Sequence, residues 1–199
     1  MRSEWLRLAA ALAVAALAGC RTASVSLPPG AGWEARRPQL QALAHFELKG
    51  RVAVAAGNEG FNASLHWIQD GARSQLFLAG PLGVGGAEVS ASGKELNLVT
   101  SRGEHLDSEA AHAALAARLG FDPPLSSLRY WVLGVPDPSA PATEALDPQA
   151  QRLSALTQAG WRIDYTEYRA VGAHALPARL TLQRDTVRVR LLVDDWQLQ

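Results

Sequence analysis

The sequence predicts a mainly β protein with one curved antiparallel sheet of about ten or eleven strands and about three short helices. Apolar and polar residues alternate with a period of two over much of 46–68 and 151–196, which is typical of strands with one buried face. Turn signals containing glycine separate these segments. Because a sheet with so many strands tends to curl, we also expect a concave apolar face.

The strands follow from this alternation. A strand over 46–54 places Phe46, Leu48, Val52 and Val54 on one face. The hairpin-like turn 57–60 leads to a second strand, in which Phe61, Leu65 and Trp67 alternate with polar residues. The remaining strands are expected over 74–79, 86–92, 94–101, 151–158, 161–169, 178–184 and 187–196.

Helices are predicted where the alternation stops. The residues from 33 to 44 are compatible with a short helix, and an alanine-rich helix over 109–119 follows Asp107 and ends at Gly120. A third short helix is expected over 126–133. The segment 135–150 contains four prolines, so the sequence predicts an irregular loop there.

Composition excludes several classes of protein. The chain has 199 residues, of which 48% are hydrophobic, and nineteen basic residues balance nineteen acidic ones. This length suits one good-sized domain or at most two small ones, and the neutral balance gives no sign of a nucleic-acid-binding surface. Cys20 is the single cysteine. A cysteine zinc cluster and an internal disulfide are therefore both excluded.

The N-terminus has the pattern of a bacterial lipoprotein signal. Arg2 and Arg7 flank Glu4 and make the first residues weakly basic. The apolar run 8–18 that follows is too short to span a bilayer, which needs about twenty residues. The run ends in 17–20, Leu-Ala-Gly-Cys, where small residues precede the cysteine. We therefore expect a cleaved signal over 1–19, a lipidated tether over 20–32 and one domain over 33–199.

No group of polar residues predicts catalysis. The five histidines form no His-Glu-x-x-His pair, no Gly-x-Ser-x-Gly elbow is present, and the glycines of 83–86 lack the lysine of a phosphate-binding loop. The sequence thus predicts no enzyme, no metal site and no cofactor other than a covalent lipid on Cys20.

Apolar side chains form the more informative pattern. Five tryptophans follow Cys20, and large side chains on a curved sheet can either fill a core or enclose a lipid tail. Leu82 lies in a glycine-rich connection between two predicted strands, where a polar residue is usual. It is either folded back onto the core or exposed as an apolar finger that touches a membrane or a partner.

These segments together resemble the LolB family of outer-membrane lipoproteins. The most specific is 128–136, Leu-Arg-Tyr-Trp-Val-Leu-Gly-Val-Pro, and the matches run in order along nearly the whole chain. They comprise 17–20, 33–43, 50–51, 67–69, 81–83, 128–136, 160–165 with Tyr168, 176–177 and 193–196.

The resemblance implies an open half-barrel whose concave side is covered by the helices as a lid, with a cavity for the acyl chains of a client. It also implies a protruding loop with an apolar residue that enters the membrane, here Leu82 between Pro81 and Gly83. The candidate cavity residues are Phe46, Leu48, Val52, Val54, Phe61, Leu65, Trp67, Leu76, Leu78, Trp131 and Trp161.

The implied function is to accept lipoproteins from a LolA-type periplasmic carrier and insert them into the outer membrane. We expect a lipid-anchored monomer on the periplasmic face of that membrane, with no nucleic-acid partner. Arg21 agrees with this location, because lipoproteins retained in the inner membrane often carry aspartate there. One alternative is an anchored binder of another lipid or amphiphile without carrier handover, and a lipid-modifying hydrolase is a second.

Overall fold

The computed structural model describes residues 32–81 and 85–199. These residues form one eleven-stranded sheet in the order β6-β5-β4-β3-β2-β1-β11-β10-β9-β8-β7, and every neighbouring pair is antiparallel. The two edge strands, β6 and β7, do not pair with each other. The prediction of a mainly β fold with an open antiparallel sheet is confirmed.

The first half of the sheet is a meander that follows helix α2 (Trp33–Gln41). Its strands are β1 (His45–Ala56), β2 (Glu59–Asp70), β3 (Arg73–Ala79), β4 (Gly86–Ser92), β5 (Glu95–Thr100) and β6 (His105–Asp107). Hairpins join them in sequence because each turn contains the predicted glycine, such as Gly57, Gly71 and Gly93 in the left-handed region.

Two helices and a second meander follow. Helix α3 (Ser108–Leu119) ends at Gly120, which adopts the left-handed conformation with φ 78°. Helix α4 (Leu125–Trp131) comes next. The closing strands are β7 (Ala142–Asp147), β8 (Arg152–Gln158), β9 (Trp161–Val171), β10 (His174–Arg184) and β11 (Val187–Leu198).

Two local predictions were wrong, and one strand was missed. Strand β7 lies inside 135–150, where an irregular loop was expected, because Pro141 and Pro148 flank the strand and leave its interior free to pair with β8. Strand β6 was not predicted, because a strand of three residues is too short to show an alternation of apolar and polar side chains. Helix α2 ends at Gln41 instead of residue 44 and contains Pro38 in its second half, so tertiary packing outweighs the helix-breaking tendency of proline.

The two meanders meet where the first strand pairs with the last. Strands β1 and β11 pair along their full length, with a bulge opposite Lys49 and Gly50. A Cβ atom on Gly50 would lie 2.2 Å from the carbonyl oxygen of Leu192. Only glycine therefore allows the two backbones to approach so closely at this central pairing.

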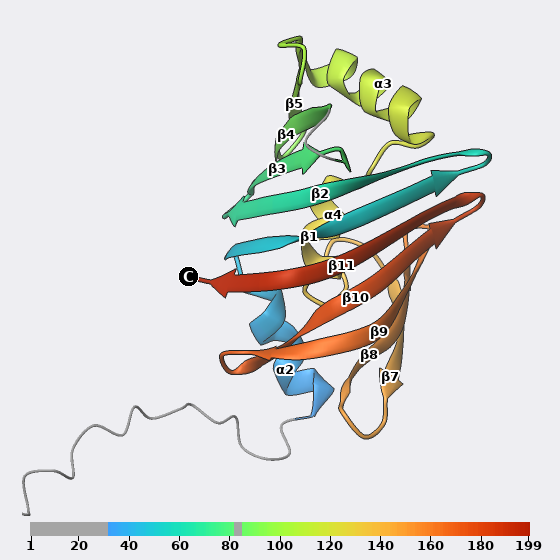
Figure 1. Cartoon of the computed structure of the whole chain (residues 1–199). Helices are drawn as coiled ribbons and strands as arrows, with labels where there is room; N and C mark the ends of the chain where they lie inside the picture. The colour runs from blue at the N-terminus through green and yellow to red at the C-terminus, as the bar shows by residue number, and fades with distance from the viewer. Residues whose placement is uncertain (1–31, 82–84) are drawn as a thin grey trace, which may run out of the picture.

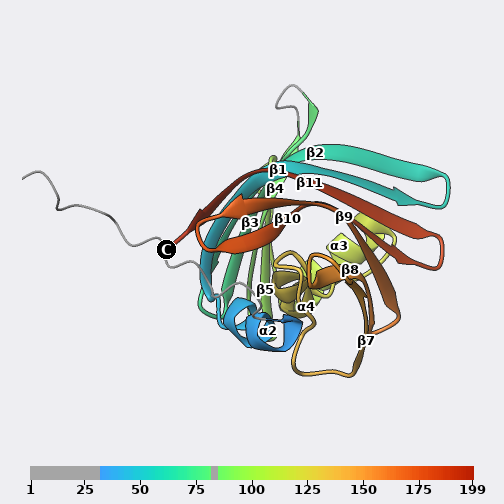
Figure 2. The same cartoon turned by 90° about the horizontal axis from the view of Figure 1, so that it is seen from below.

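The sheet curves around the three helices. Figure 1 shows β1, β2, β11 and β10 in front of α4 and α2, and Figure 2 shows the strands bending over the side that holds all three helices. Buried residues from both meanders and from the helices form one core on this concave side. The described part of the chain from residue 32 thus contains a single continuous core.

Candidate functional site

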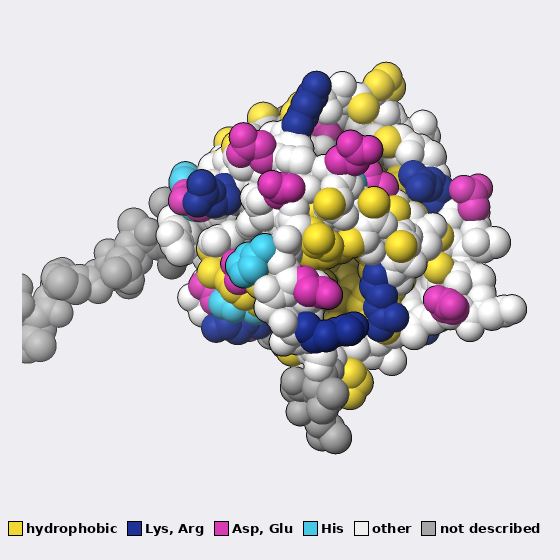
Figure 3. Space-filling view, turned by 90° about the horizontal axis from the view of Figure 1, so that it is seen from above, with side chains coloured by type: hydrophobic (Ala, Val, Ile, Leu, Met, Phe, Trp, Pro, Cys, Tyr) yellow, Lys and Arg dark blue, Asp and Glu magenta, His cyan; other side chains and the backbone are white. Residues whose placement is uncertain are grey.

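An apolar cavity of about 120 Å³ lies between the concave face of the sheet and the helices. Among the described residues, no charged side chain and no side-chain hydroxyl lines it. The sheet contributes Val52, Val54, Phe61, Leu65, Trp67, Leu76, Leu78, Val89, Trp161, Leu182, Val189 and Leu191; the helical side contributes Leu115, Leu119, Phe121, Pro123, Pro124, Leu125, Leu128 and Val132. Seen from the α3 side, hydrophobic side chains gather in and around a hollow with charged groups at its border (Figure 3).

Most of the residues predicted for an acyl cavity line this space. They are Val52, Val54, Phe61, Leu65, Trp67, Leu76, Leu78 and Trp161. They come from four strands, β1, β2, β3 and β9, and share the concave face because the alternation with period two is continuous across the strand register. Whether they hold acyl chains stays a prediction.

Three predicted residues are buried elsewhere in the core. Phe46 packs against Trp67 and Trp196, with ring centroids 6.0 and 5.5 Å apart, and Leu48 is fully buried. Trp131 donates from Nε1 to Oε1 of Gln158 at 2.8 Å. None of the three lines the cavity.

The helical half of the lining was not predicted as part of the site. Leu115 and Leu119 are four residues apart on α3, and Leu125, Leu128 and Val132 follow the same helical spacing across α4. This spacing places them on one helix face. The signal was present in the sequence, but it does not tell which surface that face covers.

Trp161 combines a cavity position with an unsatisfied donor. Its side chain is buried, and its Nε1 has no hydrogen-bond acceptor in the described structure. The guanidinium of Arg184 lies 4.8 Å from its ring centroid and the Phe121 ring lies 5.2 Å away in an edge arrangement. Trp161 is therefore held by aromatic and cation–π contacts.

Two tyrosines, the buried Tyr165 and the half-buried Tyr168, pack in and against the core. The hydroxyl of Tyr165 donates to the carbonyl oxygen of Trp131 at 2.9 Å, and that of Tyr168 donates to the carbonyl oxygen of Leu153 at 2.8 Å. Burial raises the pKa of both phenols well above the ordinary value. Both hydroxyls therefore stay protonated at neutral pH and serve as donors that hold the core together.

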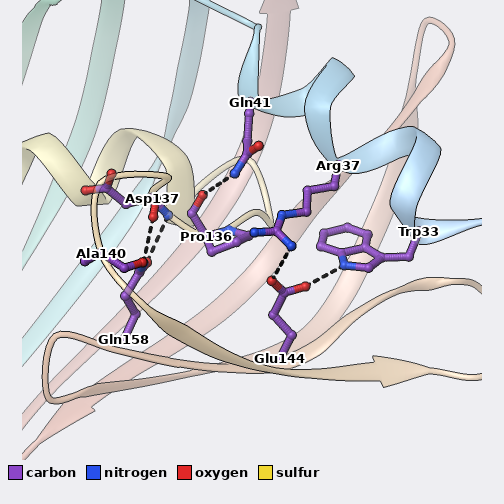
Figure 4. A network of polar contacts seen from close by, with 8 residues as sticks. All are labelled: Trp33, Arg37, Gln41, Pro136, Asp137, Ala140, Glu144 and Gln158. Carbon is purple, nitrogen blue, oxygen red and sulfur yellow. Dashed lines mark hydrogen bonds and ion pairs between the residues drawn. The ribbon is translucent and has the colours of Figure 1, made fainter.

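A polar network fastens α2 to the second meander (Figure 4). Glu144 on β7 accepts a hydrogen bond from Nε1 of Trp33 and pairs with Arg37 at 3.0 Å. Gln41 donates to the carbonyl oxygen of Pro136 at 2.8 Å. Because these contacts join α2 to β7 and to the segment after α4, this end of the concave side is closed by specific polar bonds.

The segment 108–124, comprising α3 and the residues after it, is attached differently. Among the described residues, its side chains make one polar contact, between His112 and Asp122 at 2.9 Å, and it is internal to the segment. Its contacts with the sheet are apolar or cation–π, such as Arg118 at 6.0 Å from the Phe61 ring centroid.

Two of the three predicted loop residues and the predicted lipid attachment site lie outside the described residues. These are Leu82, Gly83 and Cys20. Pro81 is described and is exposed directly after β3. Within residues 32–81 and 85–199, no helix is both long and apolar enough to cross a membrane, and no cluster of three metal-ligating side chains occurs.

The fold and the cavity define a class of protein, an open half-barrel with an apolar concave face under helices. Solved structures share the fold. A protein of the DUF1329 family from Desulfovibrio piger superimposes with a TM-score of 0.58 at 6% identity, covering 84% of this chain and 90% of that chain. A LolA superfamily protein from Nitrosomonas europaea gives a TM-score of 0.52 at 9% identity, covering 84% and 94%.

Sequence comparison identifies the family. The pattern of the family described as "Outer membrane lipoprotein LolB" matches residues 44–196. Proteins named outer-membrane lipoprotein LolB are 35% identical in Nitrosococcus oceani, with 98% of this chain and 99% of that protein covered, and 34% identical in Azoarcus sp., with 94% of each covered. The chain belongs to the LolB family.

The predicted resemblance and the predicted class are thereby confirmed. The protein is an outer-membrane lipoprotein by family, and its family is one of lipoprotein-localisation proteins and not a class of enzymes. The acylation of Cys20 stays a prediction.

Proposed function

We propose that the chain accepts lipoproteins from a LolA-type carrier, holds their acyl chains in the apolar cavity and inserts them into the outer membrane. The observation that carries this proposal is a cavity lined by apolar side chains on every side. Such a lining stabilises hydrocarbon, since each buried methylene contributes roughly 0.8 kcal/mol.

The size of the cavity implies that binding needs movement. A volume of about 120 Å³ is smaller than the 300–1,000 Å³, roughly, of ordinary ligand sites, and an acylated client carries long chains. The segment 108–124 lacks polar bonds to the sheet among the described residues, so its movement would break apolar contacts but no side-chain hydrogen bond to the sheet. The α2 end, fastened through Glu144, would stay in place.

Handover can proceed without a nucleotide. Exposure of acyl chains to water would cost many kcal/mol, so a direct mouth-to-mouth complex with the carrier is favoured. The receiver needs only a modest advantage in affinity, because about 1.4 kcal/mol shifts an equilibrium tenfold. Release then follows because the bilayer competes with the cavity for the same chains.

We also propose the processing and placement of the N-terminal part. A signal over 1–19 is removed, Cys20 carries the lipid and 20–32 is a tether to the domain over 33–199. A tether of this kind could reach about 40 Å if extended, which would let the domain work at the membrane surface as a monomer. Mass spectrometry of the N-terminal peptide of the membrane-extracted protein tests the lipid on Cys20.

Leu82, between Pro81 and Gly83, is proposed as the residue that enters the bilayer and lowers the barrier to release. Leu82→Glu should leave client binding intact and abolish release into liposomes, because a carboxylate is strongly disfavoured in hydrocarbon. The measurements are co-purification of the client with the variant and transfer of the client to floated liposomes.

Ala173→Glu is the matched control, since it adds the same charge at the exposed turn between β9 and β10. It should release client normally. Normal release by Leu82→Glu would refute the role of Leu82 while leaving the cavity proposal standing.

Carrier handover itself is tested by mixing the protein with a purified LolA–lipoprotein complex. A receptor takes the client from the carrier. If the client stays on the carrier while the protein still binds free amphiphiles, the protein is an anchored binder of another lipid.

A further inference from the structure

A groove of about 940 Å³ crosses the outer face of the sheet, on the side away from the helices. Its floor contains small side chains, Ala53 on β1 and Ala79 on β3, and one border is formed by Gly80 and Pro81 directly after β3. The family assignment and the apolar cavity do not explain this groove, because it lies on the opposite face.

Strand register sets the polar groups of the groove in two adjacent rows. The first row is Asn62, Ala53, Arg190 and Thr181, across β2, β1, β11 and β10; the second is Ser64, Arg51, Leu192 and Arg179 across the same strands. Arg190 is thus a diagonal neighbour of both other arginines. Diagonal neighbours in an antiparallel sheet lie about 7–8 Å apart, so three arginines leave the sheet within one small area and line the same groove.

The three positive charges are unequally neutralised. Arg51 makes two hydrogen bonds to the carboxylate of Asp194, at 3.1 and 2.8 Å. Arg179 is 3.5 Å from Glu167. Arg190 is exposed and has no acidic partner among the described residues. The described residues that line the groove include no carboxylate, so the groove has a local positive charge on a chain with formal net charge zero.

Neutral donors line the groove on both sides of the unpaired arginine: Thr181 lies opposite Arg190 on β10, and Asn62 lies in the same row beyond Ala53. The side chains of Asn62, Ser64 and Thr181 line the groove and make no hydrogen bond within the described structure. A guanidinium with amide and hydroxyl donors beside it matches a phosphate group, whose oxygens accept several hydrogen bonds at once.

We propose that this groove binds the phosphate of an anionic phospholipid headgroup at the bilayer surface. The position of the groove at the bilayer surface rests on the proposed function, in which residues 81–83 contact the membrane. Gly80 and Pro81 border the groove, and Figure 2 shows the ends of β3 and β4 rising from the outer side of the sheet. A domain that approaches the bilayer with this side brings Arg190 to the depth of the headgroups.

The test uses vesicle binding by the chain from residue 20 with Cys20→Ala, so that no lipid anchor holds it to the vesicle. The described part of this chain has one continuous core, and neither change removes any of that core. Co-sedimentation is measured on phosphatidylcholine vesicles with and without phosphatidylglycerol. Arg190→Gln should weaken binding to the anionic vesicles about five-fold, the equivalent of about 1 kcal/mol per basic residue at such a surface, and leave binding to the neutral vesicles unchanged.

Arg188→Gln is the matched control. Arg188 lies two residues away on the same strand and outer face, opposite Ala55, and outside the groove. A clearly smaller loss is expected for it. Equal losses for both variants would reveal diffuse attraction between surfaces and overturn the proposal, as would an unchanged affinity of Arg190→Gln.

Asn62→Asp provides a second variant, which adds a carboxylate to the row of Arg190 and should also weaken binding to anionic vesicles. Unchanged binding by Asn62→Asp counts against the site. Inorganic phosphate is also added to the anionic vesicles at a concentration equal to that of the lipid. If it displaces the wild-type chain from the vesicles, the groove binds a soluble anion and the membrane proposal is overturned.

Client uptake from the carrier is measured separately on the same variants. If the wild type takes no client but Arg190→Gln still shows its specific loss on anionic vesicles, the proposed function fails and the groove stands. If Arg190→Gln loses uptake and binds anionic vesicles normally, the groove belongs to the carrier interface and the headgroup proposal is wrong.

Discussion

The two faces of strand β2 differ in almost every property although their residues are adjacent in sequence. Leu65 and Trp67 are buried on the concave face, in or beside the apolar cavity. Asn62 and Ser64 are exposed on the outer face and line the arginine groove. One strand of twelve residues therefore contributes to both surfaces.

This difference shows how the sheet separates two kinds of chemistry. The concave face is apolar and closed over by helices, which suits the burial of hydrocarbon. The outer face keeps charged and hydroxyl side chains in water, where exposed ion pairs contribute little to stability. Changes on the inner face should consequently disturb the fold, whereas changes on the outer face should alter recognition and leave the fold intact.

The largest expected effect separates the faces directly. Leu65→Ala should lower the free energy of unfolding by about 2–5 kcal/mol, because it removes a buried side chain and enlarges the cavity. Ser64→Ala, one residue away and facing outward, should change it by less than about 0.5 kcal/mol. Denaturation in urea measures both, and similar losses would contradict the assignment of the faces.

A smaller effect is expected at the central pairing of β1 and β11. Gly50→Ala should destabilise the fold by about 1–3 kcal/mol, since the added Cβ would clash with the carbonyl oxygen of Leu192, 2.2 Å away. The melting temperature measures the loss. A variant as stable as the wild type would mean that the two strands do not approach so closely.

The smallest effect concerns the hydroxyl of Tyr168, a half-buried residue that packs against the core. Tyr168→Phe removes the hydrogen bond to Leu153 and should cost about 0.5–1.5 kcal/mol at neutral pH. Burial raises the pKa of Tyr168 in the folded state, whereas the unfolded chain has the ordinary phenol pKa of about 10. Above pH 10, roughly, the unfolded state therefore loses this proton while the folded state keeps it. The wild type consequently loses stability as the pH rises through that range.

The Phe variant has no phenol at this position to deprotonate. Its stability should decline less steeply than that of the wild type between neutral pH and the alkaline range, which unfolding curves at a series of pH values would show. Parallel declines for the two proteins would count against the buried position of this phenol.

Much of the fold could be predicted from the sequence because alternation and turn glycines act locally. The strands β1 to β5 and β8 to β11 followed from those signals. Strand β7 did not, since its burial depends on pairing with β8, and β6 has only three residues.

The cavity was predictable in part for the same reason. Alternation placed Phe46, Leu48, Val52 and Val54 on one face of β1, and that grouping is observed. Alternation could not show that Phe46 and Leu48 are buried in the core, whereas Val52 and Val54 line the apolar cavity. That distinction depends on where α3 and the residues after it lie along the strand, which is a property of tertiary packing.

The central pairing of β1 with β11 has a consequence for the order of folding. Each meander can form from neighbouring hairpins, but the seam joins residues near the two ends of the chain, such as Val52 and Leu191. Closing so long a loop is slow, and it requires that the last strand has already been synthesised. A chain that stops before β11 would leave β1 and β10 as long unpaired edges, which invite aggregation. The central seam of this sheet can therefore form only after the C-terminal strand is available.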